Sequence, residues 1–208
     1  MAIAIEASAS DTDTTVPITT SGVNRALLLM IGGGNVAKPT AITFNGAAFT
    51  KAIEFNGGTD YAAIWLLLNP DVGTYNVTLD ANGGYRALAV ALSGVNTTLG
   101  VISTDTTDSS GASNTVSVAS ILAGDVSFGC VGQRTDVGNI SVSTGTAIYT
   151  DNVRFGSGYN TSVGTSVDIV FSFGGSVDCS GVGLALRPYV AQVGGVPGVF
   201  LSDSFGFM

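Results

Sequence analysis

Hydrophobic and polar residues alternate along most of this chain with a period of two, and short apolar runs interrupt the alternation. Thr74–Leu79 and Val167–Phe173 alternate clearly. Arg25–Ile31 and Tyr61–Leu68 are almost continuously apolar. Alternation is typical of strands with one buried face, whereas continuous apolar runs are typical of strands that are buried on both faces. The pattern therefore predicts an all-β protein in which the two runs form central strands.

Turn-forming residues separate the predicted strands at intervals of about 8 to 12 residues, as in β-sandwiches and barrels. Asn45–Gly46 is a strong hairpin signal, and Asn69–Gly73 contains proline, aspartate and glycine in the order that a tight turn favours. Pro17 interrupts a strand expected at Thr14–Thr20, which indicates an edge position. About a dozen short strands of this kind predict a jelly-roll-like antiparallel β-sandwich with two sheets.

The second half of the chain is more polar. Residues 96–111 are rich in threonine, serine and aspartate, which indicates a long loop or an exposed edge strand. We expect a hairpin within Ile140–Thr150, around Thr144–Gly145. The other expected strands are Ala2–Glu6, Thr40–Phe44, Ala48–Phe55, Tyr85–Val95, Asn114–Ile121, Asp125–Gly132 and Gly181–Tyr189.

The end of the chain differs from the rest. We expect residues 1–189 to form a single β-sandwich domain and residues 190–208 to form an extended C-terminal arm, because the arm has no strand-like alternation. Apolar side chains left in water are a liability, so the arm either folds back on its own sandwich or docks on a neighbouring subunit. We favour docking on a neighbour. The predicted assembly contacts are Phe200, Leu201, Phe205, Phe207 and Met208.

Composition narrows the classes of function. The chain has 208 residues, a net charge of -8 and 11% charged residues, which argues against a nucleic-acid partner. We expect no signal peptide, since the N-terminus lacks a basic segment followed by a long apolar one. The longest apolar run, Ala62–Leu68, has seven residues and is too short to cross a membrane.

The sequence contains no histidine, which excludes a Ser-His-Asp triad and removes the commonest metal ligand. Lys38 follows a glycine-rich stretch, but Pro39 replaces the hydroxyl residue of a phosphate-binding loop. The only glutamates are Glu6 and Glu54, and we expect Glu54 to lie on a solvated strand face. We therefore predict no enzymatic activity, no catalytic residue and no cofactor.

Two further features leave alternatives open. Asp11–Asp13 and Asp105–Asp108 are small acidic clusters that calcium could use, but turn formation and solvation explain them equally well, and we predict no metal site. Cys130 and Cys179 could form a disulfide, but both lie in strand-like apolar surroundings. We favour two buried, reduced thiols.

A low charge content and an abundance of glycine, serine and threonine suit a subunit that buries much of its surface against other proteins. Four segments carry a resemblance: Asn24–Leu29, Ile42–Thr50, Ile64–Thr78 and Ala91–Val95. They are similar to a recurring β-sandwich module of structural proteins from tailed bacteriophages and of uncharacterised bacterial surface proteins. The resemblance covers roughly residues 20–100, and its motifs are turn and core positions.

The resemblance implies a virion structural protein made in the host cytoplasm. We expect a non-enzymatic capsid decoration protein that binds copies of itself and a major capsid or other virion protein, with no nucleic-acid or membrane partner. A phage tail or fibre component is an alternative.

Another alternative is a lectin-like carbohydrate-binding or adhesin module on a cell surface, with possible glycan contacts at Tyr85, Tyr149 and Tyr159 near turns. Trp65 lies in the most apolar strand and is expected in the core.

Overall fold

The structure is a computed structural model that describes residues 1–34, 38–81, 84–119, 122–134, 139–151, 154–162 and 164–191. These residues form fifteen β-strands, and all of their pairings are antiparallel. Within these ranges there is no helix that is long and apolar enough to cross a membrane. The all-β prediction is confirmed.

The central sheet contains the most apolar segments of the chain. In order across the sheet, its strands are β1 (Ala4–Asp11), β9 (Arg86–Ser93), β3 (Ala26–Gly34), β7 (Asp60–Leu68) and β6 (Thr50–Asn56). Residues of β3 and β7 on both faces of the sheet are buried. The continuous apolar runs predicted this arrangement, because a strand that is covered on both faces has no solvent side for polar residues.

One face of the central sheet packs against a smaller outer sheet. The outer sheet has the order β2 (Thr15–Thr20), β8 (Gly73–Leu79), β4 (Ile42–Phe44) and β5 (Ala47–Ala48). Leu29 and Trp65 of the central sheet pack there with Phe44 and Val77 of the outer sheet. Pro17 lies on β2, the edge strand, as predicted.

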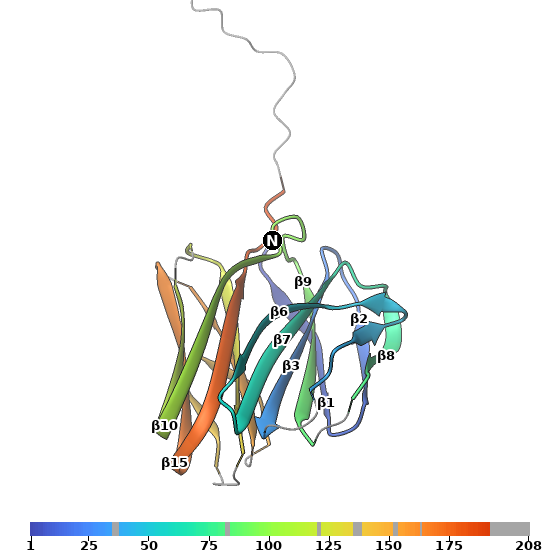
Figure 1. Ribbon diagram of the computed structural model, residues 1–208. Helices are drawn as coiled ribbons and strands as arrows, with labels where there is room; N and C mark the ends of the chain where they lie inside the picture. Colours follow the sequence, from blue (N-terminus) through green and yellow to red (C-terminus); the bar gives the residue numbers. More distant parts are fainter. Residues whose placement is uncertain are drawn as a thin grey trace, which may run out of the picture.

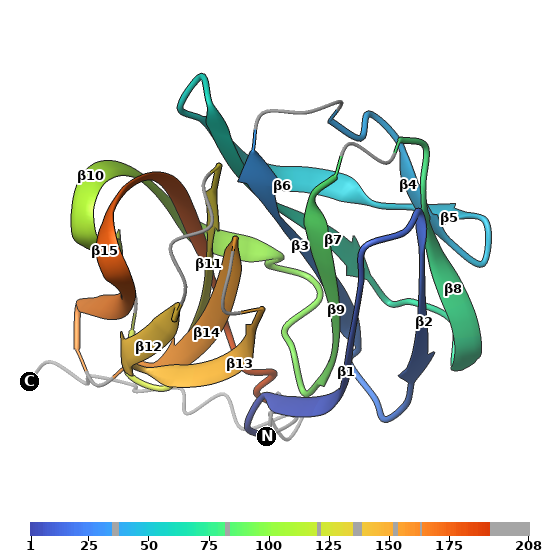
Figure 2. The ribbon, with the colours of Figure 1, turned by 90° about the horizontal axis from the view of Figure 1, so that it is seen from below.

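The opposite face of the central sheet packs against a C-terminal sheet. The strands of this sheet are β10 (Val101–Ala119), β15 (Ser166–Leu186), β11 (Val126–Gln133), β14 (Phe155–Thr161), β13 (Thr146–Thr150) and β12 (Ser141–Thr144), and β12 pairs with β15. Leu28 and Ile64 of the central sheet pack there with Phe128 and Leu184. The structure therefore has three sheet layers, which Figure 2 shows side by side, and not the two expected.

The C-terminal sheet curls around a core of its own. The two long strands β10 and β15 pair along most of their lengths, but the register shifts between Gly111 and Ser113, where residues 173–176 of β15 have no partner on β10. Beyond that point β10 turns back on itself, since the Ser103 hydroxyl donates to the carbonyl oxygen of Ala119 at 2.7 Å. Figure 1 shows β10 and β15 side by side, and Figure 2 shows both strands curling. The cluster that they enclose includes Val116, Ile169 and Phe171.

Glycines allow the central and C-terminal sheets to approach each other very closely. A Cβ atom on Gly132 of β11 would lie 2.0 Å from the carbonyl oxygen of Tyr61 and 2.4 Å from the backbone nitrogen of Gly33. Real Cβ atoms do not approach other atoms this closely, so the backbone contact requires glycine at this position.

Some predictions of turns and edge strands are confirmed, and one is corrected. Asn45 and Gly46 have φ angles of 48° and 81° and connect β4 to β5, so the predicted hairpin is confirmed. The chain turns at Gly145 as expected, but the flanking strands β12 and β13 pair with β15 and β14, so they do not form a paired hairpin with each other. In the 96–111 stretch, the edge-strand alternative is correct from Val101 onward.

Candidate functional site

Large apolar side chains are exposed mainly at one end of the molecule. In the described residues, eight large hydrophobic side chains are exposed, and one of the seven at this end, Val72, lies on the neighbouring β7–β8 turn, which Arg25 contacts through Pro70. The other six, which we consider together, are Met1, Val23, Leu99, Leu122, Tyr189 and Val190. We call these six side chains the apolar end. Their exposed fractions range from 37% for Tyr189 to 73% for Val190. An exposed group of this kind is typical of a contact surface.

Backbone hydrogen bonds bring the segments of the apolar end together. The Met1 nitrogen donates to the carbonyl oxygen of Tyr189 at 3.0 Å. The Tyr189 N–H donates to Gly94 at 2.7 Å, and the Gly94 N–H donates to Val23 at 3.0 Å. The turn that carries Leu99 is attached through the Asn96 N–H, which donates to the carbonyl oxygen of Arg187 at 2.8 Å. The apolar end therefore combines residues that are far apart in the sequence.

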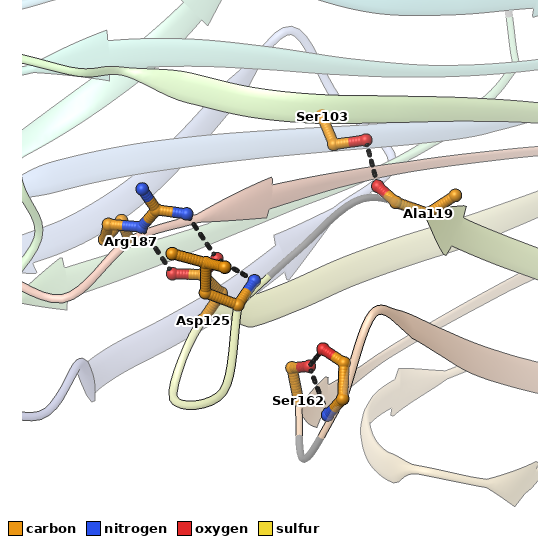
Figure 3. A network of polar contacts seen from close by, with 7 residues as sticks. Ser103, Ala119, Asp125, Ser162 and Arg187 are labelled. Atoms are coloured by element: carbon orange, nitrogen blue, oxygen red, sulfur yellow. Dashed lines mark hydrogen bonds and ion pairs between the residues drawn. The ribbon is translucent and has the colours of Figure 1, made fainter.

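An ion pair holds the loop that carries Leu122 (Figure 3). Arg187 donates from Nε and Nη2 to the two carboxylate oxygens of Asp125, each at 2.9 Å. The Leu122 N–H also donates to this carboxylate, at 2.8 Å. The Ser162 N–H donates to the carbonyl oxygen of Asp125 at 2.8 Å. These contacts fix the loop against the end of β15.

The environment of the pair favours its charged form. Burial alone would raise the pKa of Asp125, but hydrogen bonds from Arg187 and from the Leu122 N–H lower that pKa below its ordinary value. The hydrogen bond to Asp125 raises the pKa of Arg187. The loop of the apolar end is therefore anchored by two opposite charges that offset each other.

The predicted assembly contacts Phe200, Leu201, Phe205, Phe207 and Met208 lie outside the described residues. The described chain ends at Ala191, directly after two residues of the apolar end. The sequence analysis did not identify the apolar end itself. Its members are single apolar residues in turns and at strand ends, and only the tertiary fold brings them together.

The three tyrosines proposed as glycan contacts do not form one site. Tyr85 is 1% exposed and belongs to the core between the central and outer sheets, and burial raises its pKa to about 12. Tyr149 and Tyr159 are half-buried and pack against the other core, beside Phe155 and Phe128. A tyrosine as buried as Tyr85 offers no ring face to a sugar.

A polar pocket of about 370 Å³ lies at the other end of β7 from the apolar end. It is lined by Gly57, Thr59, Asp60, Asp108, Ser109, Ser110 and Asp178. The buried carboxylate of Asp60 accepts hydrogen bonds from Ser180 at 2.7 Å and from Thr59 at 3.1 Å. In the described ranges, no group of three or more acidic, cysteine or histidine residues is arranged to hold a metal ion.

The glutamates lie on opposite edge strands of the central sheet, Glu6 on β1 and Glu54 on β6. Glu54 is exposed and forms an ion pair with Lys51 at 2.7 Å, and this hydrogen bond lowers its pKa. The expectation of a solvated position is confirmed. The Lys51 ammonium also lies 5.1 Å from the ring centre of Trp65, whose side chain is in the core as predicted.

The two cysteines are free and buried, as favoured from the sequence. Cys130 faces the core between the central and C-terminal sheets, whereas Cys179 faces the core inside the curled sheet. Burial raises the pKa of both thiols, that of Cys179 to about 11. Neither thiol is set up for nucleophilic chemistry.

The described residues thus define a three-layer antiparallel β protein with exposed apolar side chains gathered at one end. A scan against protein-family models, a search of curated proteins and a search of solved structures found no match to this chain.

Proposed function

We propose that this chain is a non-enzymatic virion structural protein, and specifically a capsid decoration protein that works through protein–protein contacts. The observation that carries the proposal is the apolar end, where six exposed apolar side chains gather close to Ala191, the last described residue. The sequence resemblance to phage structural modules points in the same direction. The partners would be copies of this chain and a major capsid or other virion protein.

The physical argument is the burial of apolar surface. Each large apolar side chain that becomes fully buried contributes about 1.5–3 kcal/mol, and less where it is already partly covered. A carboxylate at the same position would oppose burial, because it would lose its hydration without gaining a partner. Single charge substitutions at the apolar end should therefore weaken association strongly.

Sedimentation velocity over a range of protein concentrations tests the proposal. We expect the unmodified chain to self-associate, and Leu99→Asp and Leu122→Asp each to weaken association at least about tenfold, which corresponds to about 1.4 kcal/mol. Thr15→Asp is the control, because Thr15 is also exposed but lies at the end of β2 opposite to Thr20, which leads into the turn that carries Val23. A monomer at every concentration, or an equal effect of the control, would contradict the proposal.

A tail or fibre component is the alternative placement within a particle. Electron microscopy of particles assembled with a tagged chain distinguishes a decoration protein from a tail or fibre component. A decoration protein would cover the head, and a tail component would not.

The polar pocket favours one other class, a carbohydrate-binding module, because carboxylates and hydroxyls are suited to binding sugar hydroxyls. A glycan array tests this alternative with Asp178→Asn in the pocket and with Tyr149→Ala and Tyr159→Ala outside it. Specific binding that Asp178→Asn abolishes would favour the module over the structural protein.

A further inference from the structure

A second apolar feature adjoins the apolar end. It is a groove of about 300 Å³ between the edge of the central sheet and the start of β10. Its lining is Ala48, Thr50, Ala52, Leu66, Leu67, Leu68, Gly100 and Val101. No carboxylate, ammonium or guanidinium lines it, so the groove suits apolar side chains. We call it the β6–β7 groove.

The groove is continuous with the apolar end. Gly100 and Val101 line the groove and directly follow Leu99, which belongs to the apolar end. Val101 pairs with Leu186, and the described chain ends only a few residues later, at Ala191. The groove and Ala191, the last described residue, are therefore at the same end of the molecule.

The edge strand beside the groove has a free side. β6 is the last strand of the central sheet, and in the described residues it pairs only with β7. An unpaired strand edge can bind an extended peptide through main-chain hydrogen bonds, while pockets beside it accept alternate side chains. The groove offers both of these features together.

The C-terminal segment has suitable chemistry for this site. Residues 199–208 read Val-Phe-Leu-Ser-Asp-Ser-Phe-Gly-Phe-Met and contain no proline, which would interrupt strand pairing. Residues 192–198 precede them and could span up to roughly 23 Å when extended. Within one copy, β6 is three strand spacings, or about 14 Å, from β9 beside Tyr189, and this sets the scale of the reach to a groove at the same end of a neighbouring copy. The segment is therefore long enough to reach such a groove.

We propose that residues 199–208 of one copy bind in the β6–β7 groove of a second copy. This inference rests on the proposed self-association through the apolar end. A contact between two apolar ends would bring Ala191 of one copy close to the groove of the other, and residues 192–208 follow Ala191 in the chain. The exchange explains why a groove and an apolar segment occur at the same end of one chain.

Engineered disulfides test the inference. One chain carries Thr50→Cys, at an exposed residue of the groove, and a second, differently tagged chain carries Phe200→Cys. After mixing under oxidising conditions, we expect a disulfide between the two chains that denaturing gels detect. The control replaces Thr50→Cys with Thr15→Cys on the solvent face of β2 and should give at least tenfold less product. The native cysteines are buried and add little background.

The outcomes separate this inference from the proposed function. If the chain self-associates but the groove cysteine gives no more product than the control, the groove inference is wrong and the proposed function survives. A chain that carries both Thr50→Cys and Phe200→Cys and cross-links only within itself would show that the segment binds its own groove, which overturns exchange between copies. If the chain stays monomeric, both proposals fail.

Discussion

Strand β3 of the central sheet and strand β10 of the C-terminal sheet have opposite patterns of burial. In β3, Ala26–Gly33 are all buried, whereas in β10 no residue from Val101 to Ser113 is buried. The difference follows from position, because β3 is inside a sheet that is covered on both faces, whereas β10 is at the edge of the C-terminal sheet. The comparison teaches that the burial of a strand depends on how many of its faces other layers cover.

The largest expected effect tests whether both faces of the central sheet are covered. Leu28 faces the C-terminal sheet and Leu29 faces the outer sheet, and both are completely buried. We expect Leu28→Ala and Leu29→Ala each to lower the free energy of unfolding by about 3–4 kcal/mol in urea titrations. Thr106→Ala on an exposed position of β10 should change it by less than about 0.5 kcal/mol. A small effect at either leucine would mean that its face of the sheet is not packed.

The next effect probes the contact between the two sheets. Gly132→Ala would force β11 away from β3, because the added methyl group overlaps backbone atoms, and we expect a loss of about 3 kcal/mol. Gly175→Ala is the matched control, since nothing lies within 4 Å of its Cβ position. Thermal unfolding of both variants measures the difference. Equal stability would show that the two layers are packed less closely than described.

A smaller effect concerns the ion pair at the apolar end. We expect Asp125→Asn to cost about 2 kcal/mol at neutral pH, because hydrogen bonds to a charged group are lost. Glu54→Gln removes the exposed pair with Lys51 and should cost less than about 0.5 kcal/mol. Urea titrations of the two variants give both values. If both variants lost a similar amount of unfolding free energy, the buried ion pair of Asp125 would be no more stabilising than the exposed pair of Glu54, which would contradict this prediction.

The same pair gives the smallest and most specific prediction, a dependence on pH. The pKa of Asp125 is lower in the folded protein than in the unfolded chain, so its contribution is present at neutral pH and is lost as the pH falls below about 4. The difference in unfolding free energy between the unmodified chain and Asp125→Asn should therefore narrow in acid. A difference that stays constant down to about pH 3 would contradict the lowered pKa.

The sequence predicted the parts of the fold that depend on local pattern. The runs at Arg25–Ile31 and Tyr61–Leu68 predicted central strands, and Asn45–Gly46 predicted its turn. The third layer was not predicted, although a strand buried on both faces needs cover on both. β14 was missed because its glycines and polar residues resemble a loop, yet they fit between β11 and β13.

The candidate site was harder to predict. Leu99 and Leu122 are isolated apolar residues in polar surroundings, and nothing local indicates that they meet at one end of the fold. Tyr85 illustrates the opposite error, in which a residue expected at the surface is buried. Proximity to a turn suggested exposure for Tyr85, but its ring packs into the core between two sheets. Exposure depends on which layers cover a strand, and this is a property of the whole topology.

Hydrogen–deuterium exchange at increasing protein concentration tests the central claim most directly. The account predicts that amides of Val23, Gly94–Val101 and Tyr189–Val190 become protected as copies associate, while those of the outer sheet do not change. Protection confined to the outer sheet, or no concentration dependence anywhere, would contradict a contact surface at the apolar end.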